Sequence, residues 1–341
     1  MITLDGSKGE GGGQILRTAL SLSMVTGRPF RMHAIRAGRK KPGLLRQHLA
    51  AVNAAREITA AEVGGAVLGS GELSFSPGSA RSGDYRFAVG SAGSATLVFQ
   101  TVLPALMLAD GVSRLTLEGG THNPFAPPFD FLGKTFLPAL ARMGPTVALE
   151  LERPGFFPAG GGLFRAIVEP VKTLAPLELN DRGLILGKRA RALVSQIPED
   201  VARRELRLLR HKLDLDEEAC SVEVVRDSPG PGNAVMIELE SESVTEVFSA
   251  FGERGLKAEW VAREAVKEAR RYLKNGAPVG EHLADQLALP LALAGQESFT
   301  TGPLSRHATT NLETIGAFLP VDFAVVELDD VLRKVSLGAS G

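Results

Sequence analysis

Two adjacent stretches near the start of the sequence combine the groups that bind phosphate. Residues 9–17 read Gly-Glu-Gly-Gly-Gly-Gln-Ile-Leu-Arg, and residues 31–56 contain seven Lys or Arg and no Asp or Glu. A glycine-dense turn that leads into a helix leaves backbone N–H groups free to face an anion, and the basic side chains add positive charge. The formal net charge of the chain is only −1. The basic region is therefore local, and it predicts a site for a phosphorylated ligand.

The standard nucleotide-binding motifs are incomplete in this chain. Residues 133–135 (Gly-Lys-Thr) end like a P-loop, but Pro128 stands where the first glycine is required. Residues 9–11 begin like the dinucleotide fingerprint G-x-G-x-x-G, but Gln14 stands at its last position. The sequence therefore supports neither a P-loop NTPase nor a Rossmann dehydrogenase.

Polar residues suited to phosphate chemistry recur along the whole chain instead. They are Glu10 and Arg17 beside the glycine-rich turn; Arg36, Arg39 and Gln47 in the basic region; Gln100; the segment 123–128 (Asn-Pro-Phe-Ala-Pro-Pro); the segment 282–286 (His-Leu-Ala-Asp-Gln); and the segment 305–311 (Ser-Arg-His-Ala-Thr-Thr-Asn). Because these residues are far apart in sequence, only the fold can bring them to one site.

The composition indicates an ordinary globular protein. Its 341 residues, 44% hydrophobic and 23% charged, suffice for two domains or for one large domain with an insert. A single cysteine, Cys220, excludes an intramolecular disulfide and fits a reducing compartment. No signal peptide is visible, and the longest apolar run, residues 96–109, is too short to cross a bilayer. We therefore expect a cytoplasmic protein with no membrane role.

The alternation of apolar and polar segments, with glycine at nearly every junction, predicts an α/β protein of packed sheet and helix layers (α+β layers). Strands are expected near 2–5, 30–36, 72–76, 84–89, 114–118, 147–152 and 163–169, and helices near 14–26, 43–58, 93–108 and 128–143.

A weak internal repetition accompanies this alternation. Small-residue loops at 11–13, 90–93, 127–128 and 280 open helices that glycines close at 27, 111, 144 and 295. The pattern favours repeated α/β units, although glycine follows helices in many α/β proteins. From about residue 181 to residue 275 glycine becomes less frequent and charged residues more frequent, and then the Leu-, Ala- and Gly-rich composition of the first half returns. We therefore predict a large domain of residues 1–180 plus 276–341 and an inserted small α/β domain of residues 181–275.

Several ordered blocks of the chain resemble those of the RNA 3′-terminal phosphate cyclase family. Residues 10–17 carry its E-G-G-G-Q-x-x-R pattern, residues 35–48 its I-R-A-G-R-x-K-P-G-L-x-x-Q-H pattern, residues 90–100 its G-S-A-G-S-x-T-L-V-x-Q pattern, and residues 156–162 its F-x-P-A-G-G-G pattern. The L-A-D-Q sequence at 283–286 and a histidine at 307 follow in the family's order. The match covers nearly all of the chain. It implies a large domain of repeated α/β units with a smaller inserted α/β domain.

The resemblance also implies an ATP-dependent reaction in three steps on RNA that ends in a 3′-phosphate. A histidine attacks the α-phosphorus of ATP and releases pyrophosphate, AMP passes to the RNA 3′-phosphate, and the 2′-hydroxyl displaces AMP to give a 2′,3′-cyclic phosphate. His307 matches the adenylated histidine, and a neutral imidazole has the free lone pair that this attack requires. Ring closure needs a 2′-hydroxyl, so the acceptor must end in ribose.

The same resemblance implies roles for the other polar residues. Expected ATP contacts are Gln100, Pro127, His282, Asp285 and Gln286, and position 282 is tyrosine in the best-known members. Expected ligands of the RNA 3′-phosphate or the ATP phosphates are Arg17, Arg36, Arg39 and Gln47. Glu10 is the expected contact of a Mg²⁺ or Mn²⁺ ion, with capping of the following helix as the alternative.

Two other functions stay open on the sequence alone. A non-catalytic relative that binds RNA in ribosome assembly would keep the fold without the nucleophile, and His307 within an intact block argues against it. A small-molecule transferase built from similar units would need neither a nucleophilic histidine nor a 3′-phosphorylated RNA. The expected partners are thus ATP and the last few nucleotides of an RNA with a 3′-phosphate end, and a homodimer is left open.

Overall fold

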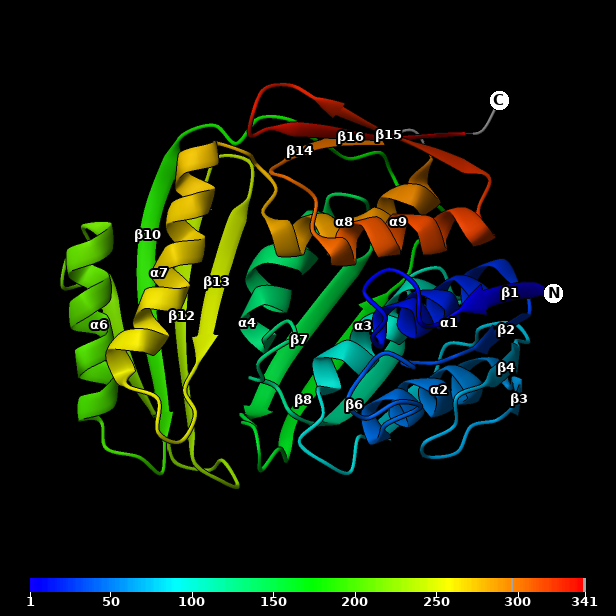
Figure 1. The fold of residues 1–341 in the computed structure, drawn as a ribbon, viewed down its shortest axis with the longest axis horizontal. Coiled ribbons are helices and arrows are strands. Elements are labelled where there is room, and N and C mark those ends of the chain that lie inside the picture. Colours follow the sequence, from blue (N-terminus) through cyan, green and yellow to red (C-terminus); the bar gives the residue numbers. More distant parts are fainter. Residues whose placement is uncertain (296, 340–341) are drawn as a thin grey trace.

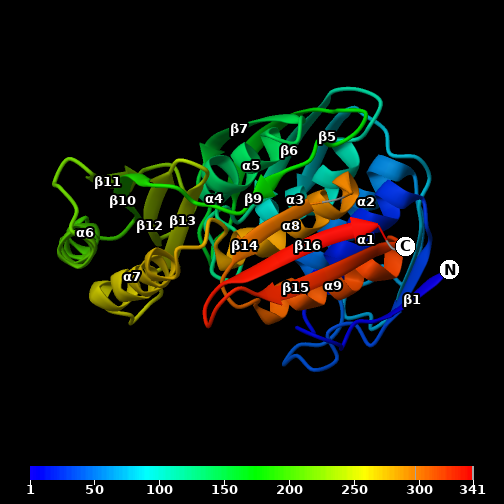
Figure 2. The same cartoon turned by 90° about the horizontal axis from the view of Figure 1, so that it is seen from above.

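The computed structural model describes residues 1–295 and 297–339. The strands of this part of the chain form four four-stranded sheets. Three of these sheets lie around a layer of helices, and the fourth lies at one end of an elongated molecule with two helices of its own (Figure 1). The N-terminus lies toward the opposite end (Figures 1 and 2).

The three sheets around the helices share one topology, a βαβαββ unit. The first unit consists of β1 (Ile2–Asp5), α1 (Gln14–Thr26), β2 (Phe30–His33), α2 (Arg46–Thr59), β3 (Glu62–Gly64) and β4 (Leu73–Ser76). Its strands lie in the order β1-β2-β4-β3, with β1 parallel to β2 and the other pairs antiparallel.

The second and third units repeat this order and these strand directions. The second consists of β5 (Asp84–Ala88), α3 (Ala95–Leu106), β6 (Ser113–Gly119), α4 (Phe129–Phe131), the π-helical turn η1 (Leu132–Phe136), α5 (Leu137–Ala141), β7 (Thr146–Arg153) and β8 (Gly162–Glu169). The third consists of β9 (Glu178–Leu179), α8 (Glu281–Ala294), β14 (Glu297–Thr301), α9 (Arg306–Phe318), β15 (Val321–Glu327) and β16 (Arg333–Ala339).

Between β9 and α8 the chain leaves the third unit and builds the fourth sheet. This segment contains β10 (Ile185–Ser195), α6 (Asp200–Leu213), β11 (Cys220–Val225), β12 (Gly232–Ser241), β13 (Thr245–Phe251) and α7 (Ala258–Asn275). The sheet order is β11-β10-β12-β13, and α6 and α7 pack together against one face (Figure 2). The α/β class, the repeated units and the insert are as the sequence predicts, while the limits of the insert at 181 and 275 stay a prediction.

Two hydrophobic cores hold these layers. The larger one fills the space between the helices and the three repeated sheets and also includes residues of the fourth sheet, such as Leu193 and Met236. The smaller one lies between the fourth sheet, α6 and α7. Residues along β8 alternate between buried and less buried positions, as expected of an antiparallel strand with one face toward water. No helix in the described ranges has the length and apolar character to span a membrane.

Two predicted elements are shorter than expected because the backbone turns early. The strand expected at 30–36 ends at His33, since Ala34 and Arg36 have φ angles of 51° and 53°, which lie outside the extended region. The helix expected from residue 43 begins at Arg46, because Gly43 has a φ of 75°. The basic region is therefore largely a loop that connects β2 to α2.

The helix expected at 128–143 divides into α4, η1 and α5, and Pro138 stands in the first turn of α5, where a missing N–H is tolerated. This segment is the second helix of its unit, whereas α1, α3 and α8 are the first helices of theirs. The four glycine-bounded helices that suggested the repeat are therefore not four equivalent units. The structure has three units, each with two helical segments.

Replacing Phe164 of β8 by alanine is expected to destabilise the protein by about 3–5 kcal/mol. The ring is fully buried and packs edge to face with Phe99 and Phe129, at centroid distances of 6.0 and 5.6 Å. Urea denaturation measures the loss. The control Val326→Ala, at an exposed position of β15, should change stability by less than about 0.5 kcal/mol. Equal effects of the two variants would contradict the assignment of Phe164 to the core.

Candidate active site

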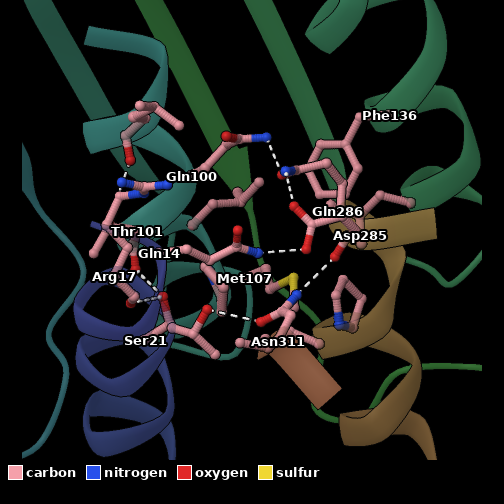
Figure 3. Close-up of a pocket in the computed structure, with 17 residues that line it drawn as sticks. Gln14, Arg17, Ser21, Gln100, Thr101, Met107, Phe136, Asp285, Gln286 and Asn311 are labelled. Carbon is pink, nitrogen blue, oxygen red and sulfur yellow. Dashed lines mark hydrogen bonds between the residues drawn. The ribbon is translucent and has the colours of Figure 1, made fainter. Parts of the chain in front are cut away.

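A cavity of about 70 Å³ with both polar and apolar lining residues lies where the first helices of the three units meet (Figure 3). Helices α1, α3 and α8 supply most of its lining, and residues of α9, η1 and α5, with Met107 just after α3, supply the rest. Its polar lining residues are Gln14, Arg17, Thr18, Ser21, Gln100, Thr101, Asp285, Gln286 and Asn311. Residues that are far apart in sequence therefore share one site because the repeated units place equivalent helices together.

Side-chain amides from several helices converge on Asp285 in this cavity (Figure 3). Gln14 donates its Nε2–H to Oδ1 of Asp285, and Gln286 donates to Oδ2 at 3.2 Å. Gln286 in turn accepts a hydrogen bond from Gln100, and Asn311 donates to the main-chain oxygen of Asp285 at 2.8 Å. Three of the residues that the sequence predicts as ATP contacts thus form one network.

His307 lies in the first turn of α9, which Ser305 caps by accepting a hydrogen bond from Ala308 N at 3.2 Å. The Nδ1 atom of His307 is 2.5 Å from Oε1 of Gln14. Because the Asp285 carboxylate accepts from the amide nitrogen of Gln14, the amide oxygen faces the ring, and Nδ1 must carry the proton. Nε2 has no hydrogen-bond partner among the residues that the structure describes, and the side chain is packed on one side while much of it stays exposed to solvent.

The surroundings favour the neutral form of this imidazole. Burial of the ring against its neighbours lowers the pKa of His307; the carboxylate of Asp285 opposes this shift, and the positive charge of Arg17 adds to it. Burial raises the pKa of Asp285, opposed by the Gln14 hydrogen bond and by the nearby positive charges. A neutral ring with a free nitrogen is the nucleophilic form of histidine.

The glycine-rich turn, residues 9–13, brings the start of α1 against α9. Gly9 and Gly11 have φ angles of 55° and 63°, and Glu10 N donates to Thr310 Oγ1 at 2.9 Å. A Cβ atom on Gly9 would lie 2.2 Å from Thr310 Oγ1. Only glycine combines this backbone conformation with so close an approach, so the turn fixes the distance between Gln14 and His307.

Arg17 supplies a half-buried cation to the cavity. Burial lowers its pKa to about 10, and Asp285 opposes this shift, so the guanidinium stays charged at neutral pH. Within residues 1–295 and 297–339 the guanidinium donates no hydrogen bond to a protein acceptor. A desolvated cation in that state gains from an anionic partner, which supports the prediction of a phosphate ligand here.

Glu10, the predicted metal contact, lies in the glycine-rich turn. Its Oε2 accepts from Gly12 N at 2.8 Å, and its Oε1 forms an ion pair with the exposed Arg39. Each carboxylate oxygen keeps a further lone pair, so Glu10 fits Mg²⁺, which takes one or two carboxylates together with phosphate oxygens and water. Among the residues described, no group of three or more His, Cys, Asp or Glu could hold a metal by itself.

The remaining predicted residues lie outside the cavity. Arg36 donates to the carbonyl oxygens of residues 41 and 43 at 2.6 and 2.9 Å, and Gln47 accepts from the backbone N of residue 94 at 3.3 Å. The carbonyl oxygen of Pro127 accepts from the hydroxyl of residue 96 at 2.7 Å. His282 faces α7, with Nε2 3.7 Å from Oε2 of Glu268. These four residues make contacts within and between the loops and helices around the site.

The sequence assigned no role to Gln14, which appeared there as the residue that breaks the dinucleotide fingerprint and as the glutamine of the E-G-G-G-Q-x-x-R pattern. It also missed a repeat signal within the site. The first helices α3 and α8 both read x-x-Leu-x-x-Gln-x-x-Leu-Pro, so that Gln100 and Gln286 are the sixth residues of equivalent helices. These two glutamines hydrogen-bond to each other. This shared sequence pattern is the signal from which the contact between the two glutamines could have been predicted.

A fold of three βαβαββ units, with a cation, a carboxylate and an oriented imidazole at their centre, defines a class of proteins suited to phosphate chemistry. The family model for RNA 3′-terminal phosphate cyclase matches residues 8–325. The chain is 56% identical over 333 residues to the RNA 3′-terminal phosphate cyclase of Koribacter versatilis (strain Ellin345), a match that covers 98% of this chain and 94% of that relative. The chain belongs to the RNA 3′-terminal phosphate cyclase family and is an enzyme of it.

Replacing Gly9 by alanine is expected to cost about 2–4 kcal/mol of stability, because the left-handed backbone and the approach of Thr310 both oppose a side chain. Gly27 is the matched control. It has a φ of 69° but no neighbour within 4 Å of an added Cβ, so Gly27→Ala should cost only about 1 kcal/mol. Urea denaturation compares the two. A smaller loss at Gly9 than at Gly27 would contradict the close approach.

His48 generates a prediction for acid stability. Burial, and the charges of Arg17 and Arg36, lower the pKa of His48 to about 3, and its Nδ1 accepts a hydrogen bond from Leu45 N at 3.0 Å. The unfolded chain binds this proton near pH 6.5. The contribution of His48 to stability is therefore complete above pH 6.5 and is lost as the pH falls toward 3.

Between pH 7 and pH 5 the wild type should thus lose about 2 kcal/mol that His48→Gln does not lose. Urea titrations of both proteins at the two pH values measure this difference. An identical pH dependence in the two proteins would show that His48 is not held neutral by the fold.

Proposed function

We propose that this enzyme uses ATP to convert an RNA 3′-terminal phosphate into a 2′,3′-cyclic phosphate through AMP bound covalently to His307. The observation that carries the proposal is the orientation of the imidazole: Gln14 holds Nδ1 as the N–H, and Nε2 is free to attack. Membership of the cyclase family, and the name of the Koribacter relative, support the RNA end as the acceptor.

In the first step, Nε2 of His307 forms a bond to the α-phosphorus of ATP, and the bond from that phosphorus to pyrophosphate breaks. The ring becomes positively charged as Nε2 gives up its lone pair. Its Nδ1–H donates to Gln14, which the Asp285 carboxylate holds in place, so a fixed acceptor and a nearby negative charge stabilise the cation. Arg17 and the N–H groups of the glycine-rich turn offset the charge of the phosphates.

In the second step, an oxygen of the RNA 3′-phosphate attacks the same phosphorus, and the bond to His307 breaks. In the third step, the ribose 2′-oxygen attacks the 3′-phosphorus, loses its proton, and expels AMP. A vicinal 2′-hydroxyl is required for this ring closure, so a DNA 3′-phosphate would accept AMP without cyclising. The exposed side of the imidazole gives both ATP and the RNA end access to the same nitrogen.

The cavity network suits the nucleoside part of ATP. Asp285, Gln100 and Gln286 offer hydrogen bonds to ribose hydroxyls and base edges. The enclosed volume of about 70 Å³ is smaller than the 300–1,000 Å³ typical of ligand pockets, so the nucleotide must extend to the mouth and compete with the Gln100–Gln286 hydrogen bond. A Mg²⁺ or Mn²⁺ ion at Glu10 would neutralise the leaving pyrophosphate.

The alternatives are less well supported by this geometry. A non-catalytic RNA-binding relative has no need of a neutral, oriented imidazole beside an arginine whose guanidinium donates no hydrogen bond within the described part of the chain. A small-molecule transferase has no need of a nucleophilic histidine that is open to solvent. The proposal extends to a cytoplasmic setting, which the single cysteine favours.

Replacing His307 by alanine is expected to abolish the protein–AMP adduct while the circular dichroism spectrum stays unchanged, because the side chain is exposed and the helix cap lies on Ser305. Incubation with α-labelled ATP, followed by denaturation and peptide mapping, measures the adduct. The control His211→Ala changes an exposed histidine of α6 in the insert and should retain full adduct formation. Labelling of the His307 variant at the wild-type level would overturn the proposal.

A further inference from the structure

Two phenylalanines project into solvent from ordered loops. Phe125 is 103% exposed and Phe157 is 58% exposed. Phe125 has a φ of 62°, a conformation that costs energy for a residue with a side chain. Its loop is nevertheless held in place, since Asn123 Nδ2 donates to Ala92 O at 2.6 Å. The structure thus holds an exposed aromatic ring at a fixed place in a strained conformation, and strain of this kind is typical of ligand-binding sites.

The loops that carry these rings both contact residues 90–93, the turn that opens α3. Asn123 binds the turn from one side. Gly160, in the loop of Phe157, approaches it from another, since a Cβ on Gly160 would lie 2.7 Å from Ala92 Cα. The rings of His122 and Phe156 lie 5.5 Å apart and join the two loops. Residues 90–93, 121–128 and 154–161 therefore form one loop cluster.

The basic region borders this loop cluster. Arg46, an exposed residue at the start of α2, donates to Gly90 O at 3.0 Å, and Gln47 accepts from Ser94 N at 3.3 Å. Residues 31–56 contain no Asp or Glu, and neither does the loop cluster. Exposed aromatic rings and neighbouring positive charge are the two components of a surface for single-stranded nucleic acid.

Continuous contacts connect the loop cluster to the catalytic imidazole. A Cβ on Gly13 would lie 2.3 Å from His48 Nε2 and 2.9 Å from Arg17 Nη1, so both side chains lie over this glycine. His48 directly follows Gln47, which binds the start of α3. Gln14 directly follows Gly13 and contacts His307. A ligand held at His307 by its phosphate end can therefore extend across the basic region toward the loop cluster.

We propose that Phe125 and Phe157, together with Arg46, bind the single-stranded RNA immediately upstream of the 3′-phosphate. The rings stack on bases, which every base permits, and the guanidinium contacts the backbone phosphates. Paired bases cannot present their faces in this way, so the surface selects single strands. This inference rests on the proposed function, because it takes the RNA end as the substrate held at His307.

The test is the affinity of the full chain for a labelled ten-nucleotide RNA with a 3′-phosphate, measured by fluorescence anisotropy with the RNA single-stranded and with it annealed to its complement. Phe125→Ala and Phe157→Ala should each weaken single-strand binding about tenfold and reduce the preference over the duplex. Phe125→Trp should bind as the wild type does, whereas Phe125→Leu should bind as the alanine variant does. Trp260→Ala, which removes another exposed aromatic ring, on α7, is the matched control.

Unchanged single-strand affinity in both alanine variants, or an equal loss in the Trp260 variant, would overturn the inference. Formation of the protein–AMP adduct is measured in the same preparations, because it requires no RNA. A wild type that forms no adduct would defeat the proposed function itself. A wild type that forms the adduct and cyclises RNA, beside phenylalanine variants of unchanged affinity, would defeat the surface for upstream RNA alone.

Discussion

The hydrogen bonds from Asp285 through Gln14 to His307 are the constraint on which the active site depends. An ionised carboxylate can only accept hydrogen bonds, so it determines which end of the Gln14 amide points toward the histidine. The amide oxygen then determines which ring nitrogen carries the proton. The Asp285 carboxylate thereby selects, through Gln14, the nitrogen of His307 that we propose as the nucleophile.

The positions of Asp285, Gln14 and His307 relative to one another follow from the repeated architecture. Gln14 opens the first helix of the first unit, Asp285 lies in the first helix of the third unit, and Gln100 lies in the first helix of the second. Each βαβαββ unit must bury one face of its sheet. All three units bury that face against the same layer of helices, so the helices meet. The insert departs between β9 and α8 and adds its own core, so it lengthens the chain without interrupting that layer.

The sequence predicted most strands and helices of the first two units closely, because the placement of glycine and the hydrophobic period are local signals. It missed the short strand β3, and it predicted one continuous helix where α4, η1 and α5 lie. It overextended the strand after Phe30 and the helix before Arg46, where left-handed residues turn the chain. It proposed no elements within the insert. Among the site residues it named Asp285, Gln286 and His307 but not Gln14. Which side chain touches which depends on how distant helices pack, and no local pattern reveals that the amide of residue 14 lies between residues 285 and 307.

The most direct test of this account is the tautomer of His307, measured by long-range ¹H–¹⁵N correlation NMR on protein with ¹⁵N-labelled histidine, the signal being assigned by its absence in His307→Gln. At neutral pH the account predicts a neutral ring with the proton on Nδ1 and a free, unprotonated Nε2. A ring with its proton on Nε2, or a doubly protonated ring, would contradict it, because neither form offers a free Nε2 for the proposed attack on ATP.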